Sequence, residues 1–462
     1  MFSFFKINDP YRLIAAYALL LIGKIAYSFW GLGITVPDFG WLLIGERLGN
    51  GFVMYRDLYD HTGPLSALTY RLLDYVFGRS IIAHRVVSYV LICFNATLLS
   101  RQLVRSRAFN ENNYLPGFFY ILLTLAIPDG GSLSPMLMSS TFILLALSNV
   151  FKRVGNEASD ELFLYAGLYL GIASLFYLPA ITFFVILLLS LLIFSTAIPR
   201  RLFLFFYGLT IPMILGIANY FWHDAFDYFI EQFFAGSLLS SRRFYVSWSS
   251  FLVIGGVFLF WLFYSLIQVL GGGRHGNFEA KIIQIMLLVA VAATFSIILD
   301  VTLQPAQLYL FLPALAFLLT HLSLLIKKRV FKLAVPILMT VSFIANPYWL
   351  SVSTDLKRYK LEKKKIIGIS KAKVMVLANE PEAYYVNQEF SGPFLHQELS
   401  LKHLQYLDYY ETSYQIYLSI KKDRPRVIID DWQLMTSVFE RFPTLAEQYR
   451  AGANSRYYLI NN

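Results

Sequence analysis

The stretch LFLYAGLYLGIASLFYLPAITFFVILLLSLLIFST, residues 162–196, decides the fold class. It contains no charged residue, and it is longer than the roughly 20 residues with which a helix crosses a bilayer. Pro179 lies near its middle, and because proline disfavours a continuous helix we expect two spanning helices joined by a tight turn at Tyr177-Leu178-Pro179. The stretch therefore predicts a polytopic α-helical membrane protein.

The composition of the whole chain supports the same class. Of its 462 residues 57% are apolar and only 15% are charged, against roughly 25% charged in a soluble domain. The single cysteine, Cys93, excludes an intramolecular disulfide and a cysteine zinc cluster. We predict about eleven transmembrane helices, from apolar segments at 11–30, 81–100, 114–127, 133–151, 162–176, 179–197, 201–221, 248–270, 279–299, 305–326 and 330–348.

The basic residues predict the topology, because Lys and Arg concentrate on cytoplasmic loops. Alternate loops are rich in Lys and Arg, and we expect these loops to lie on one side of the membrane. Their basic residues are Lys6, Arg12, Arg101, Arg105, Arg107, Lys152, Arg153, Arg200, Arg201, Arg274, Lys327, Lys328, Arg329 and Lys332. The opposite short loops, at 128–132, 177–179 and 300–304, carry none. We predict a plasma (inner) membrane protein with a cytoplasmic amino terminus and an external carboxyl terminus. The net charge of +10 has this topological origin, so we expect the bilayer and no nucleic acid as a partner.

The polar stretches predict two domains. Loops 31–80 and 222–247 are long and external, and the aromatic residues Phe226, Phe229 and Phe233 predict a helix lying at the membrane interface. Residues 351–462 form a polar tail that begins with a charge-rich linker at 357–365. The tail alternates predicted strands with helices, at 373–378, 399–421, 426–430, 432–450 and 457–460. We predict a transmembrane domain at 1–350 with these external loops, and a small extracytoplasmic α/β domain at 351–462.

Ionisable residues gather in the first external loop, PDFGWLLIGERLGNGFVMYRDLYDHTGP at 37–64. Near a bilayer such residues are costly unless they are paired or used. They are Asp38, Glu46, Arg47, Arg56, Asp57, Asp60 and His61. Flanking patterns predict a helix at 39–49, lying along the membrane surface on Trp41, Ile44 and Leu48, and a second at 64–77 with Thr62 as its cap.

This loop resembles that of the GT-C superfamily of membrane glycosyltransferases, most closely the protein mannosyltransferase and aminoarabinose transferase branch. The similarity lies in an aspartate before a surface helix, a glycine-rich turn, YRD at 55–57, DH at 60–61, GP at 63–64, FG at 77–78 and Arg85. The segment QPAQLYLFLP at 304–313 is similar to a late span of that branch, and the tail resembles its outer α/β domain. The resemblance extends over the whole layout of the chain, but only 37–85 is specific enough to be a motif.

The resemblance implies transfer of a sugar from a polyprenyl-phosphate donor to a glycan, lipid or protein acceptor at the external face of the membrane. It implies that Asp38 is the catalytic base or orients the acceptor; the alternative interpretation of Asp38 is a cap of helix 39–49. Many members carry a second acid in the next external loop, and Asp129 is the acid available there. Its other interpretation is an Asp-Gly turn.

The remaining candidates are predicted to bind substrate, and each has a structural alternative. They are Arg56, Asp57, Asp60, His61, Arg85, Arg242, Arg243 and Gln307. Arg56 could hold the phosphate or pair with Asp57 or Asp60, and the Arg242-Arg243 pair could capture a lipid-linked phosphate or contact headgroups. Arg85 could pair with an acid of the first loop, and Gln307 could line a sugar pocket or belong to a simple helix start. No metal ligand set can be assigned, and a divalent metal stays open.

A non-catalytic alternative fits the same layout. Because the usual second acid is lost, the chain could be a GT-C-like membrane scaffold that binds an envelope assembly partner. A transporter ranks third, since the two halves show neither a repeat nor a matching pair of broken spans.

Overall fold

The computed structural model describes residues 2–5, 9, 11–30, 33–109, 111–155, 159–194, 199–240, 242–271, 276–326, 329–351, 359–362, 372–406, 409–452 and 455–460. Predictions for Lys6, Arg274, Lys327 and Lys328, and for most of linker 357–365, lie outside these ranges. The chain forms two compact units. Unit 1 comprises Met1–Gly33, Ile82–Gly216 and Phe244–Tyr359, and unit 2 comprises Ile34–Ile81, Ile217–Arg243 and Lys360–Asn462. The predicted division into 1–350 and 351–462 stays a prediction.

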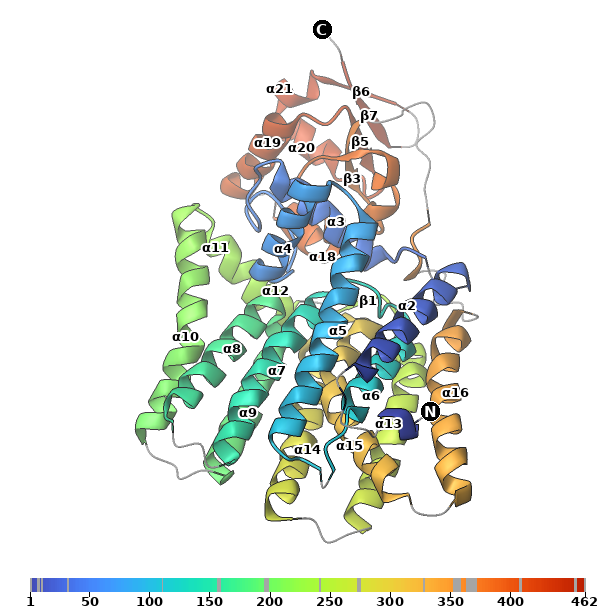
Figure 1. The fold of residues 1–462 in the computed structure, drawn as a ribbon. Helices are drawn as coiled ribbons and strands as arrows, with labels where there is room; N and C mark the ends of the chain where they lie inside the picture. The colour runs from blue at the N-terminus through green and yellow to red at the C-terminus, as the bar shows by residue number, and fades with distance from the viewer. Residues whose placement is uncertain are drawn as a thin grey trace. The chain divides into compact units, whose positions relative to one another are not determined.

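Unit 1 is built almost entirely from helices (Figure 1). Its longer elements are α2 (Arg12–Trp30), α5 (Ile81–Arg105), α6 (Leu115–Ala126), α7 (Pro135–Val154), α8 (Glu161–Phe176), α9 (Phe183–Phe194), α10 (Pro199–Trp222), α13 (Trp248–Gly271), α14 (Asn277–Leu299), α15 (Leu312–Leu325) and α16 (Arg329–Ser351). The short ones are α1 (Phe2–Phe5), η1 (Leu178–Thr182), β2 (Thr302–Leu303) and η3 (Pro305–Phe311). Every predicted apolar segment coincides with one or two of these helices.

Among the residues that the structure describes, seven helices are long and apolar enough to cross a membrane: α5, α7, α10, α13, α14, the continuous η3–α15 and α16. Three further apolar helices, at Leu115–Ala126, Glu161–Phe176 and Leu178–Ile193, are shorter. The chain is therefore a multi-pass helical membrane protein, while the total of eleven spans stays a prediction. The break at Tyr177-Leu178-Pro179 is confirmed, because α8 ends at Phe176, Tyr177 is extended and Pro179 lies in the first turn of η1.

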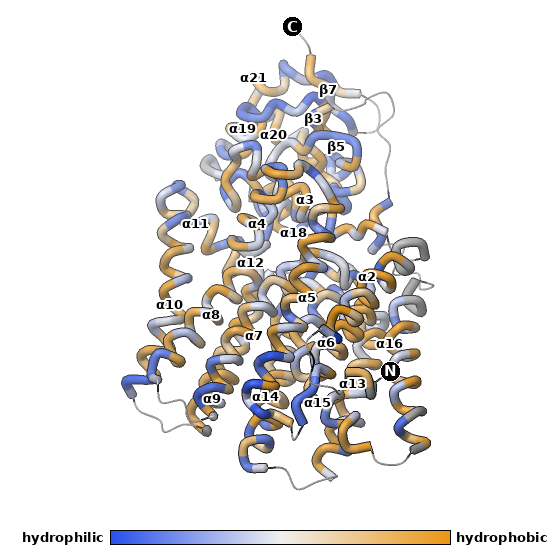
Figure 2. Tube along the Cα trace, viewed as in Figure 1, coloured by the Kyte–Doolittle hydropathy of each residue, from blue (hydrophilic) through white to orange (hydrophobic). Residues whose placement is uncertain are grey.

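Several basic residues of unit 1 lie at the ends of its helices. Arg105 lies in the last turn of α5, Lys152 and Arg153 lie in the last turn of α7, and Arg201 follows the start of α10. The guanidinium groups of Arg153 and Arg201 both stand over the Phe163 ring, at 5.8 and 5.9 Å. In Figure 2 these helix ends are hydrophilic and the helix bodies are largely hydrophobic. The side of the membrane on which these residues lie stays a prediction.

Unit 2 begins with two helices whose ends follow from local sequence. Thr35 caps α3 (Val36–Gly49), and Pro37 lies in its first turn. Helix α4 (Pro64–Phe77) starts with proline after Gly63, so the predicted cap by Thr62 is wrong. The helices pack closely, because an added Cβ on Gly45 would lie 2.7 Å from the Tyr70 carbonyl oxygen. Most residues of α3 are buried within the protein, and its position along the membrane surface stays a prediction.

The second loop predicted to be external contains a helical run of α11 (Phe226–Phe229), the π-helix η2 (Ile230–Ala235) and α12 (Gly236–Leu239), followed by β1 (Arg243–Phe244). Its position at the membrane interface stays a prediction, and Phe226 is 37% exposed. Phe229 and Phe233 are fully buried, with rings 5.4 and 6.3 Å from that of Tyr55. These aromatics belong to the core of unit 2.

The tail contains a five-stranded sheet in the order β4-β3-β5-β7-β6. Its strands are β3 (Lys373–Leu377), β4 (Glu389–Phe390), β5 (Val427–Asp430), β6 (Tyr449–Ala451) and β7 (Arg456–Leu459). The pairs β3–β4 and β3–β5 are parallel, and β5–β7 and β6–β7 are antiparallel. The three predicted strands are confirmed as β3, β5 and β7.

Helices of the tail are shorter than predicted. The segment 399–421 contains two helices, α18 (Gln397–Gln405) and α19 (Tyr410–Asp423). Within 432–450 lie α20 (Met435–Arg441) and α21 (Pro443–Ala446), and the segment ends in β6. Two 3₁₀ turns, η4 (Pro381–Ala383) and η5 (Tyr385–Asn387), follow β3.

Candidate functional site

Asp38 lies in the first turn of α3 and completes a capping box with Thr35. The Thr35 hydroxyl accepts the Asp38 amide N–H at 3.3 Å, and Asp38 Oδ2 accepts the Thr35 amide N–H at 3.4 Å. Asp38 is 5% exposed. The helix-cap interpretation is therefore confirmed for this contact, and the catalytic role of Asp38 stays a prediction.

Tyr70 of α4 brings Asp38 and Asp60 into one electrostatic environment. Its side chain is fully buried, and its ring stacks on Trp41 with centroids 6.0 Å apart. Burial raises the pKa of Tyr70 well above its ordinary value, and the nearby negative charges of Asp38 and Asp60 raise it further. The phenol therefore stays protonated at physiological pH and can act as a hydrogen-bond donor.

Asp60 is positioned by a tight turn and by the π-helix η2. Its Oδ1 accepts the Thr62 amide N–H at 2.7 Å, and its own amide donates to Gln232 Oε1 at 3.2 Å. The Gln232 amide nitrogen donates to the Tyr55 carbonyl at 2.6 Å, and Gln232 is fully buried. Tyr55 has a φ of 70°, a left-handed conformation that is rare for an aromatic residue. The loop that presents Asp60 is thus fixed by buried hydrogen bonds.

Arg243 and Glu382 form an ion pair next to this loop. Arg243 Nη2 lies 3.2 Å from Glu382 Oε1, and their side chains are 13% and 4% exposed. Burial raises the pKa of Glu382, Arg243 opposes the shift, and the charge of Asp60 contributes to it. Glu382 Oε2 is buried and, within the described part of the chain, has no hydrogen-bond partner. One carboxylate oxygen is therefore left unsatisfied beside Asp60.

His61 and His396 meet edge to face, with ring centroids 4.7 Å apart. Both ring nitrogens of His396 and Nδ1 of His61 are buried without a hydrogen-bond partner among the described residues. Burial lowers the pKa of His396 well below its ordinary value, and its electrostatic interactions with His61 and Arg243 lower it further. His396 is therefore a neutral imidazole at pH 7 with unused hydrogen-bonding capacity.

These neighbouring side chains form what we call the buried polar cluster. It contains Asp38, Asp60, His61, Tyr70, Arg243, Glu382 and His396. All seven belong to unit 2. The cluster offers carboxylates to accept a proton, a phenol to donate a hydrogen bond and a guanidinium to bind an anion.

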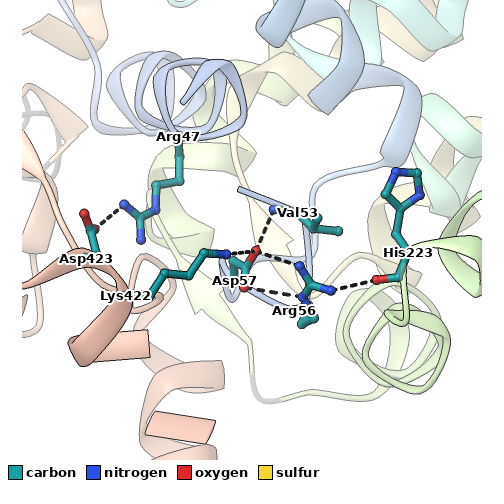
Figure 3. A network of polar contacts seen from close by, with 7 residues as sticks. All are labelled: Arg47, Val53, Arg56, Asp57, His223, Lys422 and Asp423. Carbon is teal, nitrogen blue, oxygen red and sulfur yellow. Dashed lines mark hydrogen bonds and ion pairs between the residues drawn. The ribbon is translucent and has the colours of Figure 1, made fainter. Parts of the chain in front are cut away.

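A second polar network occupies another part of unit 2 (Figure 3). Arg56 donates to Asp57 through Nε and Nη2, at 3.4 and 3.2 Å, and through Nη1 to the His223 carbonyl at 2.8 Å. Lys422 Nζ and the Val53 amide N–H also reach Asp57 Oδ2, at 3.2 and 2.9 Å. Burial acts to raise the pKa of Asp57, but the hydrogen bonds and charges of these partners lower it below its usual range. The predicted pairing of Arg56 with Asp57 is confirmed.

Arg47 joins α3 to the tail through the carboxylate of Asp423 (Figure 3). Nη1 of Arg47 donates to Oδ2 of Asp423, and the side chains are only 3% and 2% exposed. Lys373 Nζ and the Gly392 amide N–H each lie 3.2 Å from the same carboxylate. The Arg47 guanidinium also stands 3.3 Å from the centroid of the Phe52 ring. This pair secures the first external loop to the tail of unit 2.

Asp129 lies in unit 1, in the turn between α6 and α7. It is 4% exposed, and its Oδ2 accepts a hydrogen bond from the Tyr359 hydroxyl. The Ser132 amide donates to its carbonyl at 2.9 Å, so the turn interpretation is confirmed for the backbone. Lys24 of α2 is buried in the same environment and donates to the Thr124 carbonyl at 3.2 Å. Because Asp38 belongs to unit 2, a cavity shared by the two acids stays a prediction.

The other predicted residues have local partners. Arg85 donates to the Gly33 carbonyl at 2.6 Å and forms no ion pair with a described residue, so the expected pairing with a loop acid is wrong. Gln307 is fully buried and donates to Asp300 Oδ2 and the Thr302 carbonyl, at 2.6 and 2.7 Å. Arg242 is exposed. Binding roles for these residues stay predictions.

The sequence left open whether the protein binds a divalent metal, and it did not identify every residue of the buried polar cluster. In the residues that the structure describes, no group of three or more His, Cys, Asp or Glu side chains could hold a metal ion. We therefore derive no step through a metal. Tyr70 lies within the motif at 37–85 but was not predicted as a site residue, and His396 and Glu382 lie outside that motif.

The comparisons with known proteins give a likeness of fold. No protein-family model and no curated protein matches the chain. The structure is similar to that of ArnT from Cupriavidus metallidurans in the apo state, with a TM-score of 0.57, 11% identity and 97% of each chain covered. The same enzyme bound to undecaprenyl phosphate gives a TM-score of 0.54, again with 11% identity and 97% of each chain. ArnT is an aminoarabinose transferase of the GT-C superfamily, so the predicted resemblance to that superfamily is confirmed as a shared fold.

Proposed function

We propose that the chain is a membrane glycosyltransferase that transfers a sugar from a polyprenyl-phosphate donor to an acceptor at the external face of the membrane. The observation that carries the proposal is the buried polar cluster, which groups four of the predicted residues, Asp38, Asp60, His61 and Arg243. Its segments are those that the positive-inside pattern predicts to be external. The fold likeness to an aminoarabinose transferase solved with undecaprenyl phosphate supports the choice of donor.

The reaction is a substitution at the anomeric carbon of the sugar. The acceptor hydroxyl attacks that carbon and forms the new C–O bond, while the C–O bond to the lipid phosphate breaks and the polyprenyl phosphate leaves with the electron pair. The acceptor must lose its proton, and Asp38 is our candidate to receive it. Tyr70, protonated beside Asp38, would orient that carboxylate or the acceptor through its O–H group.

Of Arg56 and Arg243, which both lie in loops predicted to be external, Arg243 is the better candidate to contact the phosphate. All three nitrogens of Arg56 already donate to Asp57 or His223. Arg243 is paired with Glu382, and a guanidinium group binds phosphate through paired donors. We propose that the departing phosphate competes with Glu382 for Arg243. Asp129 stays a separate candidate for a second acid, to be tested by its own substitution.

The test is transfer by the full chain in membrane vesicles supplied with a labelled polyprenyl-phosphate sugar, with vesicles lacking the protein as the blank. Asp38→Asn should lower transfer roughly 100-fold or more, the usual contribution of a general base. Asparagine keeps an amide oxygen that can accept the Thr35 amide N–H, so the capping box survives and only the charge is lost. Asp227→Asn, an exposed residue of α11, is the matched control. Full transfer by Asp38→Asn would overturn the proposed base.

The capping box favours one alternative, a non-catalytic scaffold that binds an envelope assembly partner. In that case Asp38 would serve only to start α3, and Thr35→Val should harm the protein more than Asp38→Asn does. Equal label incorporation with and without the protein, together with a stoichiometric cross-linked partner, would establish the scaffold.

A further inference from the structure

A cavity of about 750 Å³ opens at the basic end of unit 1. Its walls come from the last turns of α5 and from the carboxyl-terminal end of α7. Tyr114, which precedes α6, and Phe278 of α14 complete them. This volume is in the range of small-molecule sites in proteins, which is roughly 300–1,000 Å³. The cavity lies within unit 1, remote in sequence from the buried polar cluster, and the proposed sugar transfer makes no use of it.

The lining of this cavity is strongly cationic. Arg101, Arg105, Arg107 and Lys152 all line it, and none of the described lining residues is acidic. None of the four forms an ion pair with a carboxylate in the described ranges. Arg101 and Arg105 are one helical turn apart, a spacing at which like charges repel. An anion bound in the cavity would relieve this repulsion.

The backbone holds a cation where glycine is the usual residue. Arg107 has a φ of 49°, in the left-handed region. Its amide donates to the Val104 carbonyl and the Ala108 amide to the Leu103 carbonyl, both at 3.0 Å, which is the Schellman pattern that ends a helix. Glycine would adopt this conformation without strain. The sequence instead places a charged side chain there, at the cavity wall.

A polar side chain at the same wall is incompletely satisfied. Gln102 lines the cavity and is 6% exposed, and its amide nitrogen donates to the Leu144 carbonyl at 2.9 Å. Its amide oxygen is buried and finds no hydrogen-bond donor in the part of the chain that is described. A ligand that brings a hydroxyl group to this wall could satisfy the oxygen after rotation of the amide.

The position of the cavity indicates which kind of anion it would bind. Helix α5 is one of the seven helices apolar enough to cross a membrane, and it ends at Arg105, so the cavity lies at headgroup depth. Figure 2 shows this end of α5 as hydrophilic and its body as largely hydrophobic. Apolar lining residues, Leu98, Phe151 and Phe278, adjoin the cations. A phosphate with an attached acyl chain matches both parts of the lining.

We propose that this cavity is a binding site for the headgroup of an anionic phospholipid, on the side of the membrane that the basic loops predict to be cytoplasmic. The phosphate would contact Arg101, Arg105, Arg107 and Lys152, and the acyl chain would follow the apolar lining. Basic residues at helix ends also have a topological role, but that role requires only charge and no cavity. The proposal therefore differs from the positive-inside effect in requiring these particular residues.

Native mass spectrometry of the full chain in detergent tests the site, with phosphatidylglycerol and the neutral phosphatidylcholine as probes. We expect phosphatidylglycerol to remain bound in preference to phosphatidylcholine, and Arg101→Gln/Arg105→Gln to weaken its binding roughly tenfold or more. The single variants Arg101→Gln and Arg105→Gln are each compared with Arg200→Gln. All three variants remove one positive charge, so Arg200→Gln is the control for the change in net charge. Arg200 is an exposed basic residue on the same predicted side that does not line the cavity.

The proposal is overturned if Arg200→Gln weakens binding as much as either single variant does, or if both lipids bind equally. Inorganic phosphate is the soluble competitor in a separate arm. Displacement of the lipid by micromolar phosphate would identify a soluble phosphate compound as the ligand and would also overturn the lipid assignment. Thermal unfolding of each variant without added lipid shows whether the substitutions leave the protein folded.

Discussion

Replacing Arg47 by methionine should destabilise unit 2 strongly, because the substitution leaves the Asp423 carboxylate buried without its main partner. Breaking a buried ion pair costs about 3–5 kcal/mol. The two side chains are 3% and 2% exposed, so solvent does little to replace the lost contact. Lys373 keeps its contact with Asp423 at 3.2 Å, but its side chain is 51% exposed, and an exposed pair contributes about 0–1 kcal/mol. We therefore expect a loss near the lower limit, about 3 kcal/mol.

Native-state proteolysis of the full chain in detergent measures this loss. Where opening is fast relative to cleavage, the cleavage rate follows the population of the open state. A change of about 3 kcal/mol corresponds to roughly 100-fold faster cleavage within the tail. Lys373→Met, which removes only the exposed partner of Asp423, is the control and should accelerate cleavage less than roughly fivefold.

The double variant Arg47→Met/Asp423→Leu gives the sharper comparison. Because it removes both charges, it should recover much of the stability that Arg47→Met loses. If Arg47→Met is cleaved no faster than Lys373→Met, the reasoning fails, since the pair would then be neither buried nor important to the fold of unit 2.

Two further predictions concern the interior of unit 2. Burial lowers the pKa of His396 below its ordinary 6.5. At acid pH the unfolded chain therefore binds a proton at this residue that the folded chain does not bind. The free energy of unfolding should fall as the pH drops below about 6.5, by up to about 1.4 kcal/mol per pH unit. Thermal unfolding at pH 7.5 and 5.5 should show a smaller acid loss in His396→Phe than in the wild type or in the exposed control His223→Phe; an unchanged loss would contradict the assignment. Gly45→Ala should cost about 1–3 kcal/mol, because its Cβ would lie 2.7 Å from the Tyr70 carbonyl oxygen. Gly40→Ala meets no atom within 4 Å and should stabilise α3 by up to about 1 kcal/mol; equal unfolding temperatures for the two glycine variants would mean that α3 and α4 do not pack so closely.

Local features of the sequence were enough to predict most elements. Helix α4 begins at the proline that predicted it, and the break between α8 and η1 falls at Tyr177, beside Pro179. Strands β3, β5 and β7 were recognisable as short apolar runs in a polar tail. These features depend on residues within a few positions of one another, which is why one sequence suffices to find them.

Features that depend on distant residues were missed. The aromatic spacing in 222–247 correctly predicted a helix, but its environment is set by Tyr55, more than 150 residues away. Likewise His396 and Glu382 gain their significance from Asp60, His61 and Arg243, which come from other segments of the chain. A helical or polar pattern specifies which face of a segment will be covered, and the covering partner is decided by tertiary folding.

The carboxylates of Asp423 and Glu382 differ in how completely their oxygens are satisfied, although Arg47 Nε is also buried without a hydrogen-bond partner among the described residues. The carboxylate of Asp423 accepts hydrogen bonds from Arg47, Lys373 and Gly392. In the buried polar cluster, Glu382 Oε2 and both ring nitrogens of His396 have no hydrogen-bond partner within the described residues.

Each unsatisfied buried group costs about 1–3 kcal/mol, so a cluster selected for stability alone would have lost them. Protein sites that bind and transform ligands commonly retain such groups at the expense of stability. It follows that His396→Phe, besides its weaker acid response, should raise the unfolding temperature at pH 7.5 and lower sugar transfer. A variant that is more stable and fully active would show that the cluster is only an imperfectly packed core.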